Sequence, residues 1–426
     1  MIRRRNYSAV VAASLALMGL FAFHAHRACA QGSWATASSV GFTPRYGMAA
    51  EAVSGKIYVI GGVTDTGIFT GIEIYDPATD SWSTPATTGD FIARRGFTAS
   101  VANGKIYVIG GSTDTGFTAI VQAFDPATDR WSTEATSGAV APSDFATSCT
   151  VDGKIYVIGG MSSPGFFDTL EVFNPLTDSW STPPTIGQFI RRYHATCAVV
   201  NGKIYIFGGQ VPRFGTLQPD AVMANLEVLV PSLFSWTEPA TSYAPMPRTD
   251  LAASVIDGEV YFIGGASLLG QAGEVELADT LEVYDPSNNT WSVPITTGPF
   301  TARQGLASAV VNGKIYVFGG RANIGINTLP SNIVEVFTPS SNSVSQSSLR
   351  TGFSVYPNPT TASVTITGVR GAAHVENVLG ERESVPETRS LEPGTRSLDL
   401  SQLPAGTYFV RIETPGGVRM RRVVKE

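Results

Sequence analysis

The sequence predicts an all-β fold, and three observations support that prediction. The chain of 426 residues has 44 glycines and 26 prolines but only 15% charged residues, which is typical of many short strands joined by tight turns. An apolar run, Ile57–Ile60, has no polar face and therefore suits a strand packed between neighbouring sheets. The octapeptide around it, GKIYVIGG, recurs identically or nearly so, starting at Gly55, Gly104, Gly153, Gly202, Gly258 and Gly313.

Residues 1–30 have the features of a secretory signal peptide. Arg3–Arg5 form a basic start, Ala9–Phe23 an apolar core that is short for a membrane span, and Ala28–Ala30 an A-x-A-like cleavage site. We expect this segment to be removed during export by the general secretory route. No later stretch is apolar enough to predict a transmembrane segment.

The spacing of the repeats predicts how the strands are organised. The second glycines of the GG pairs are separated by 49, 49, 49, 56 and 55 residues. A period near fifty residues indicates a β-propeller or a related array, with one four-stranded unit in each repeat.

A second signature follows each octapeptide, for example IEIYDPATDSW from Ile72 and LEVYDPSNNTW from Leu281. A double glycine after a strand, then an aromatic residue, then a tryptophan at a fixed offset resembles the Kelch repeat. The resemblance implies that residues 31–347 form a six-bladed Kelch β-propeller. Closure of the ring would remove exposed sheet edges.

Two segments could complete the sixth blade. Trp34 precedes Trp82 by 48 residues, in register with the other tryptophans, whereas the sixth repeat has Val344 at the tryptophan position. The outer strand of blade six therefore comes either from the segment around Trp34 or from SNSVSQSS near Val344.

The end of the chain has a different composition. A Ser-rich linker ends at residues 348–352, and strand-like alternation with Pro/Gly turns follows over residues 353–426. Tyr356–Pro359 and Ala405–Tyr408 resemble the C-terminal type A sorting domain of the type IX secretion system. This resemblance implies a small C-terminal β-sandwich that the outer-membrane secretion machinery handles. It also implies a location outside a bacterial cell or on its outer surface.

Cysteine and histidine residues are too few for a usual metal site. Outside the signal peptide, only Cys149 and Cys197 remain, and the propeller region has His194 alone. We therefore expect no metal and no cofactor. The two cysteines lie four and five residues before their repeat glycines, and alternation along a strand argues against a disulfide. We expect both to be buried apolar fillers.

The charge of the repeat region excludes one class of partner. Residues 31–351 contain 16 basic and 27 acidic residues, so the surface should repel nucleic acid. We expect a monomer.

Five of those basic residues occupy one repeat position, ten before the repeat glycine: Arg45, Arg94, Arg192, Arg248 and Arg303, with Ser143 in the third repeat. In one interpretation they hold the backbone in place, as structural arginines of Kelch repeats do. In the other they line the channel mouth and, with Tyr193, bind a carboxylate or sulfate.

The positions next to these arginines vary more between repeats, which indicates a lopsided pocket on blades three to five. The spans from each GG to the following strand are 11, 11, 11, 18, 17 and 15 residues, so blades four to six have longer loops. These loops share a face with the start of the inner strands. That face is where we expect a ligand.

Three classes of function remain open. The absence of a catalytic constellation favours a secreted binding module for a protein or glycan. An enzyme resembling the Kelch sialic-acid epimerases or mutarotases would use His194, Asp144 or Asp250 as acid/base groups. A structural or adhesive surface protein would need no pocket.

Overall fold

The computed structural model divides the chain into two compact units, residues 1–340 and 341–426. It describes residues 32–340 except 139, 142, 163–164, 212–219, 242, 270–273 and 325–326. In the second unit it describes 354–356, 363–367, 372–376, 382–385, 387–389, 395–414 and 417–425. The expected signal peptide and the linker end at 348–352 lie outside these residues. Among the described residues, no helix is long and apolar enough to cross a membrane.

The described part of the first unit contains five four-stranded antiparallel sheets and one five-stranded sheet, here called blades and given from the innermost strand outwards. Blade 1 is β2 (Ala49–Val53), β3 (Lys56–Ile60), β6 (Ile72–Asp76) and β7 (Ser81–Ser83). Blade 2 is β8 (Thr98–Ala102), β9 (Lys105–Ile109), β12 (Val121–Asp125) and β13 (Arg130–Thr133). Blade 3 is β14 (Thr147–Val151), β15 (Lys154–Ile158), β16 (Leu170–Asn174) and β17 (Ser179–Ser181).

The remaining blades follow the same plan. Blade 4 is β18 (Thr196–Val200), β19 (Lys203–Phe207), β22 (Leu226–Val230) and β23 (Ser235–Thr237). Blade 5 is β24 (Ala252–Ile256), β25 (Glu259–Ile263), β28 (Leu281–Asp285) and β29 (Thr290–Ser292). Blade 6 is β32 (Ala307–Val311), β33 (Lys314–Phe318), β36 (Val334–Pro339) and β1 (Gly32–Thr36), whose outer edge pairs with the short β30 (Thr296–Thr297).

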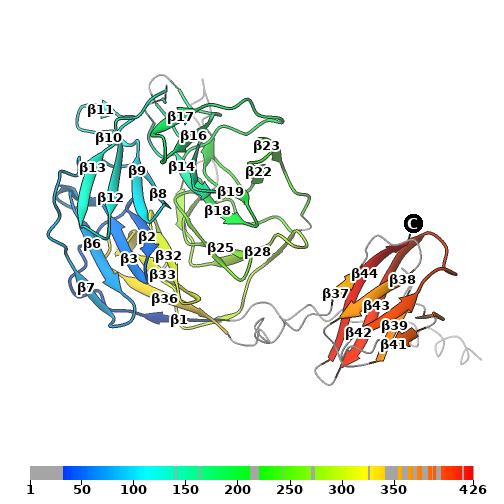
Figure 1. The fold of residues 1–426 in the computed structure, drawn as a ribbon. Helices are drawn as coiled ribbons and strands as arrows, with labels where there is room; N and C mark the ends of the chain where they lie inside the picture. Colours follow the sequence, from blue (N-terminus) through cyan, green and yellow to red (C-terminus); the bar gives the residue numbers. More distant parts are fainter. Residues whose placement is uncertain are drawn as a thin grey trace, which may run out of the picture. The chain divides into compact units, whose positions relative to one another are not determined.

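The innermost strands form a closed ring (Figure 1). Residues of all six strands line a central channel. Contacts run from β2 to β8, β14, β18, β24 and β32 in turn, and β32 contacts β2. The regular spacing of the octapeptides therefore corresponds to one blade for each repeat. The all-β prediction is confirmed.

The blades are held together by apolar layers between them. In one such layer, Tyr58 and Ile60 of blade 1 pack with Ile106, Val108 and Trp131 of blade 2. The octapeptide strands are buried on both faces because they are the second strands of blades that have a neighbour on each side.

The strand around Trp34 closes the ring. β1 pairs with β36 in antiparallel register, with Trp34 opposite Phe337. The Trp34 side chain is buried, and its ring centroid lies 4.6 Å from that of Phe300 and 5.1 Å from that of Phe337. The first of the two closure alternatives is correct. Val344 lies outside the described residues.

The double glycines are required where neighbouring blades approach each other. A Cβ on Gly208 would lie 2.3 Å from the carbonyl oxygen of Arg248 in the next blade, and one on Gly209 would lie 2.7 Å from that of Tyr193. Both distances are shorter than a real contact allows, and both glycines have positive φ. The amide of Gly209 donates a hydrogen bond to the Arg248 oxygen at 2.8 Å.

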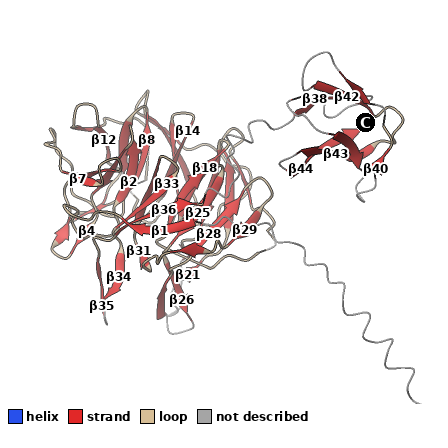
Figure 2. Cartoon of the chain, turned by 90° about the horizontal axis from the view of Figure 1, so that it is seen from below, coloured by secondary structure: helices blue, strands red, loops and turns tan. Residues whose placement is uncertain are grey.

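Hairpins of unequal length extend from one side of the ring, between the second and third strands of blades 1, 2, 4, 5 and 6. The short ones are β4 (Val63–Thr64)/β5 (Gly67–Ile68) and β10 (Ser112–Thr113)/β11 (Gly116–Phe117). The others are β20 (Gln210–Val211)/β21 (Ala221–Val222), β26 (Ala266–Leu269)/β27 (Glu274–Leu277) and β34 (Arg321–Ile324)/β35 (Asn327–Pro330). Figure 2 shows β21, β26, β34 and β35 extending from the same face. This is the long-loop face.

The second unit consists of two four-stranded antiparallel sheets. One contains β37 (Ser354–Tyr356), β38 (Ser363–Thr367), β42 (Thr395–Asp399) and β41 (Glu387–Arg389). The other contains β40 (Arg382–Glu383), β39 (Ala372–Glu376), β43 (Gly406–Thr414) and β44 (Gly417–Lys425). The hydroxyl of Tyr408, in the Ala405–Tyr408 stretch, donates to the Pro404 oxygen at 3.0 Å. Pro357–Pro359 lie outside the described residues.

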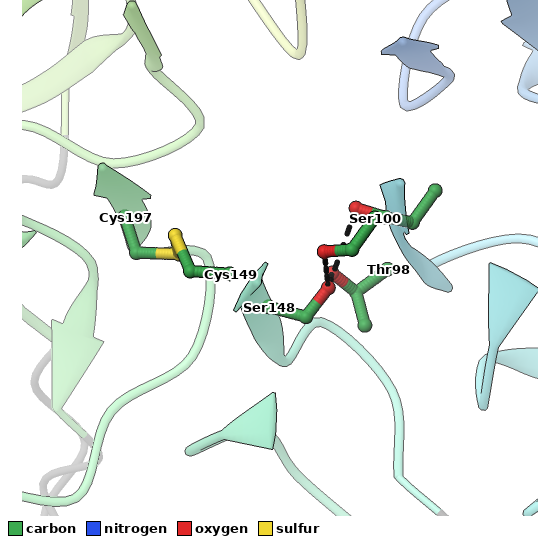
Figure 3. Close-up of a disulfide and its surroundings, with 6 residues drawn as sticks. Thr98, Ser100, Ser148, Cys149 and Cys197 are labelled. Carbon is green, nitrogen blue, oxygen red and sulfur yellow. Dashed lines mark hydrogen bonds between the residues drawn. A yellow bond between two sulfur atoms is a disulfide. The ribbon is translucent and has the colours of Figure 1, made fainter. Parts of the chain in front are cut away.

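The prediction that Cys149 and Cys197 are unpaired is wrong. They form a disulfide between the innermost strands of blades 3 and 4, with their Cα atoms 6.4 Å apart (Figure 3). The two positions do point to opposite faces of their own strands, as alternation requires. In a ring of blades, however, the forward face of one inner strand meets the backward face of the next.

The same offset recurs at other seams. Ser100 and Ser148 pair through their hydroxyls at 2.8 Å, and so do Ser254 and Ser308 at 2.8 Å. In each pair the first residue lies four before its repeat glycine and the second lies five before. An offset of one residue is therefore the register that brings two inner strands together.

The closing strand generates a test of the fold. Trp34→Ala should lower the free energy of unfolding by about 3–5 kcal/mol, since it removes a large buried side chain from the blade that joins the two ends of the ring. Chemical denaturation measures the change. Ser33→Ala, which alters an exposed neighbour in the same strand, is the matched control. Equal stability of the two variants would contradict the closure.

Candidate functional site

A ring of six residues in left-handed backbone conformation surrounds the channel at the long-loop face. Their φ angles are 63°, 65°, 58°, 56°, 55° and 63°. These residues, eight before each repeat glycine and here called the collar, are Gly47, Gly96, Phe145, His194, Asp250 and Gly305.

Backbone hydrogen bonds link successive collar residues. Five of the six amides donate to the carbonyl of the equivalent residue in the preceding blade: Phe145 to Gly96 at 2.7 Å, His194 to Phe145 at 3.1 Å, Asp250 to His194 at 3.2 Å, Gly305 to Asp250 at 2.8 Å and Gly47 to Gly305 at 2.8 Å. The fold therefore imposes positive φ here, and glycine accepts it without steric cost.

Three consecutive blades have side chains at this position despite that cost. A non-glycine residue in the left-handed region costs roughly 1–2 kcal/mol, and such strain is concentrated at functional sites. Phe145 and His194 are stacked, with ring centroids 3.9 Å apart. Nδ1 of His194 lies 2.6 Å from Oδ1 of Asp250.

The collar surrounds a cavity of about 410 Å³. Besides the collar residues, its lining includes Tyr46, Arg95, Asp144, Gln304 and Arg321. Arg95 is exposed and Arg321 is half-buried. The cavity thus combines aromatic rings, an imidazole and charges of both signs on the long-loop face.

Asp144 is the most deeply buried acid of the cavity, with 4% of its surface exposed. Burial raises the pKa of its carboxyl group, whereas the Ser112 hydroxyl, which donates to Oδ2 at 2.8 Å, and the charges of His194 and Arg95 act in the opposite direction. Its Oδ1 leans over Gly96, at the place where a side chain on that glycine would stand.

The structure brings His194, Asp144 and Asp250 together in this cavity. They come from blades 4, 3 and 5, which is the lopsided arrangement expected from the variable positions. Tyr193 is directed elsewhere, because its hydroxyl donates to Oδ2 of Asp220 at 2.6 Å. It is not among the residues that line the cavity.

The expectation that the repeat arginines line the channel mouth is wrong. Their side chains are 0–1% exposed and lie inside their own blades. Four of them form ion pairs with a glutamate on the third strand of the blade: Arg45–Glu73, Arg192–Glu227, Arg248–Glu282 and Arg303–Glu335. Carbonyl oxygens accept further hydrogen bonds from these arginines; Arg303, for example, donates to Gly319 at 2.8 Å and Thr301 at 2.8 Å.

Blades 2 and 3 vary this arrangement. Arg94 donates to the Gln122 side chain, and burial lowers the pKa of this arginine to about 10. In blade 3, Ser143 replaces the arginine, and Glu171 accepts from the Ala141 amide at 3.0 Å. The structural interpretation of these arginines is therefore the correct one.

Two charged residues of the channel were not anticipated. Arg321 directly follows the double glycine of blade 6, where the other blades have Val63, Ser112, Met161, Gln210 and Ala266. Glu51 lies four before its repeat glycine, where the others have serine, cysteine or alanine. An alignment of the six repeats at these positions would have found both.

Comparison with known proteins agrees with the repeat architecture. The KLHDC2/KLHL20/DRC7 Kelch-repeats domain matches residues 145–350, and the Attractin/LZTR1 beta-propeller matches residues 23–213. The secretion system C-terminal sorting domain matches residues 354–426. The chain is a Kelch-repeat β-propeller with a C-terminal secretion-system sorting domain. This sorting domain indicates secretion to the surface of a bacterial cell or beyond it.

Known Kelch proteins match part of the propeller. The Rab9 effector protein with kelch motifs of Xenopus laevis is 36% identical over 101 residues, which are 23% of this chain and 26% of that protein. Its human counterpart is 37% identical over 101 residues, with the same shares of 23% and 26%. An F-box/kelch-repeat protein of Arabidopsis thaliana is 33% identical over 106 residues, 25% of each chain. The matched part is thus about a quarter of each relative's length.

The Kelch propeller has a second cavity, of about 350 Å³, in the channel between the collar and the opposite face. It is lined by small residues, the disulfide and hydroxyl pairs, and Glu51 is its one charged lining residue. Burial raises the pKa of Glu51 to about 8. This carboxyl group therefore keeps its proton to a higher pH than an ordinary glutamate does.

The arginines of the Kelch repeat generate one prediction. Arg303→Met should lower the free energy of unfolding by about 3–5 kcal/mol, because it leaves Glu335 buried without its partner. Adding Glu335→Leu should recover part of that loss. The control, Arg95→Met, changes an exposed arginine and should alter stability by less than about 0.5 kcal/mol. A native melting temperature for Arg303→Met would contradict the structural role of the arginine.

Glu51 generates a pH-dependent prediction. The unfolded side chain has a pKa near the ordinary value of 4.5 for a glutamate, and the folded one has a pKa of about 8. Between these values the folded state retains a proton that the unfolded state has lost, so stability falls as pH rises from about 4.5 through 8 and is constant above.

Glu51→Gln should remove this fall. At pH 9 the variant should be more stable than the native protein by roughly 2–4 kcal/mol, and at pH 4 the two should agree. Denaturation at both pH values measures the difference, with Glu276→Gln on an exposed hairpin as control. A stability difference that does not depend on pH would refute the assignment.

Proposed function

We propose that the protein is a secreted binding module that holds a protein or glycan ligand at the collar cavity. The observation that carries the proposal is that Phe145, His194 and Asp250 occupy positions where the fold favours glycine and converge on one cavity. The sorting domain supports exposure of this face outside the cell. The whole is best described as a six-bladed Kelch propeller followed by a small β-sandwich, secreted as a monomer.

The long-loop face suits this role for mechanical reasons. The residue nine before each repeat glycine pairs with the residue that follows the double glycine, as in Tyr46 with Val63 and Gln304 with Arg321. Each hairpin is thereby attached to the rim of the cavity. A rigid scaffold with hairpins of unequal length can hold a ligand without paying a large ordering entropy.

One observation favours a second candidate function, a carbohydrate-active enzyme such as an epimerase or mutarotase. The contact of His194 Nδ1 with Asp250 leaves Nε2 as the ring nitrogen that can accept or donate a proton at the cavity. Asp144, whose carboxyl group has a raised pKa, is a candidate for the second acid/base group. A structural or adhesive role is the third candidate and would make no use of this geometry.

Proton NMR on the full secreted chain with acidic and neutral sugars and short peptides tests the proposal. We expect line broadening of a ligand without chemical change, and a loss of affinity of about tenfold or more in His194→Gly. Asn201→Gly is the matched control, because it removes a left-handed side chain of the same blade at the other end.

The other outcomes separate the candidates. New anomer or epimer signals over hours, absent in His194→Gly, would favour the enzyme. Binding that is the same in His194→Gly and the native protein would place the ligand away from the collar and refute the proposed site. If no ligand of the panel binds or changes chemically, the result would favour the structural role.

A further inference from the structure

The innermost strands meet through pairs of like side chains, with one exception. At each seam, the residue four before one repeat glycine faces the residue five before the next, as the disulfide and the two hydroxyl pairs show. Figure 3 shows two of these pairs. The sequence places Ser100 with Ser148, Cys149 with Cys197, Ala198 with Ala253, Ser254 with Ser308, and Ala309 with Ala50. The sixth pair is unlike, because it joins Glu51 of blade 1 to Ala99 of blade 2.

The carboxyl group of Glu51 therefore has no partner across its seam. The methyl group of Ala99 can neither donate nor accept a hydrogen bond, and no ion pair or hydrogen bond joins the Glu51 carboxyl group to another described residue. Tyr58 lies opposite Glu51 on β3, but its ring packs on Phe124 of blade 2, with centroids 5.9 Å apart. Glu51 lines the channel cavity of about 350 Å³ and is available to a ligand there.

The rest of the cavity lining is neutral and of two kinds. Serine hydroxyls come from blades 2, 3, 5 and 6, and each oxygen of a hydroxyl pair can accept a further hydrogen bond. Alanine and valine side chains supply the apolar part of the lining. The cavity thus combines a single acid, several acceptor oxygens and apolar surface for a short hydrocarbon chain.

We propose that this channel cavity binds a primary alkylammonium ion, whose ammonium group pairs with the Glu51 carboxylate and whose alkyl chain lies against the alanine and valine side chains. An ammonium group has three N–H donors, which the carboxylate and lining hydroxyl oxygens can accept together. This site is separate from the collar and does not depend on the function proposed for the collar.

Other classes of small ligand fit the cavity less well. An anion would meet the Glu51 carboxyl group and no cationic lining residue, and the acidic body of the propeller would repel it. A divalent metal ion needs several carboxylate or carbonyl ligands, and the described residues hold no group of three His, Cys, Asp or Glu that could bind one. An alcohol would supply no charge to pair with the carboxylate.

The surroundings of Glu51 also predict an exchange of protons. Burial raises the pKa of its carboxyl group, and no neighbouring positive charge opposes that effect. The facing groups stay uncharged at pH 7: burial raises the pKa of Tyr58 too, the two cysteines are disulfide-bonded, and the other lining residues do not titrate. A bound ammonium ion favours the carboxylate form, so Glu51 should release its proton when the ion binds.

Calorimetric titration of the full chain with butylammonium, 1-butanol and butyrate tests the proposal. Butylammonium should bind about tenfold or more tightly than the other two. From methylammonium to butylammonium, each added methylene should tighten binding roughly two- to fourfold, because it is buried against apolar side chains. At pH 7, buffers that differ in ionisation enthalpy should reveal the proton released on binding.

Glu51→Gln should weaken butylammonium binding about tenfold or more, abolish the proton release and leave 1-butanol unchanged. The Glu51→Gln protein is expected to fold, as argued above from its pH-dependent stability. Glu276→Gln, on an exposed hairpin of the long-loop face, is the matched control and should bind butylammonium as the native protein does.

Three results would overturn the inference. These are no binding of butylammonium, equal binding by the native protein and Glu51→Gln, and equal affinities for butylammonium and 1-butanol. Loss of butylammonium binding in His194→Gly but not in Glu51→Gln would place the amine at the collar and would equally refute the channel site. None of the first three results bears on the collar, whose test uses sugars and peptides.

Discussion

The close approach of the double glycine to two backbone carbonyls is the constraint on which the rest of the structure depends. The first glycine lies against the next blade, and the second lies against the inner segment of its own blade, with no room for a Cβ on either. This contact sets the spacing and tilt of neighbouring blades, so the apolar layers can pack between them. It also positions the collar. A collar residue comes two residues after the carbonyl that the first glycine meets, and one residue after the carbonyl that the second glycine meets.

The buried arginines and the collar residues have different roles where neighbouring blades meet. The arginines donate to carbonyls and to a glutamate, or to a glutamine in blade 2, within their own blades and have no exposed surface left for a ligand. The collar residues face the channel instead, because their left-handed backbone turns the chain there. In the blades whose collar residue has no ligand to contact, glycine occupies the collar position. The side chains of Phe145, His194 and Asp250 cost backbone strain that nothing in the repeat requires, which is why we assign them to a ligand.

The sequence was sufficient for the repeat and the ring, because period and glycine pairs are one-dimensional patterns. For the strand that closes the ring, it left two candidate segments, one around Trp34 and one near Val344. It also indicated His194, Asp144 and Asp250 through their departure from the other repeats. The direction of the side chains could not be predicted in this way. A shift of one residue along the chain decides whether a side chain at the start of the inner strand faces the channel or its own blade. The two interpretations of the arginines therefore stayed open until the structure was known. The cysteines were misassigned for a different reason, because alternation along one strand does not give its register with the next inner strand.

The central claim is that the collar side chains serve a ligand and not the fold. The direct test is the free energy of unfolding of the triple variant Phe145→Gly, His194→Gly and Asp250→Gly. Relief of left-handed strain, roughly 1 kcal/mol at each residue, should offset the lost contacts, so stability should stay within about 1 kcal/mol of the native value or rise. A loss of several kcal/mol would show that these side chains hold the ring together and would contradict the account.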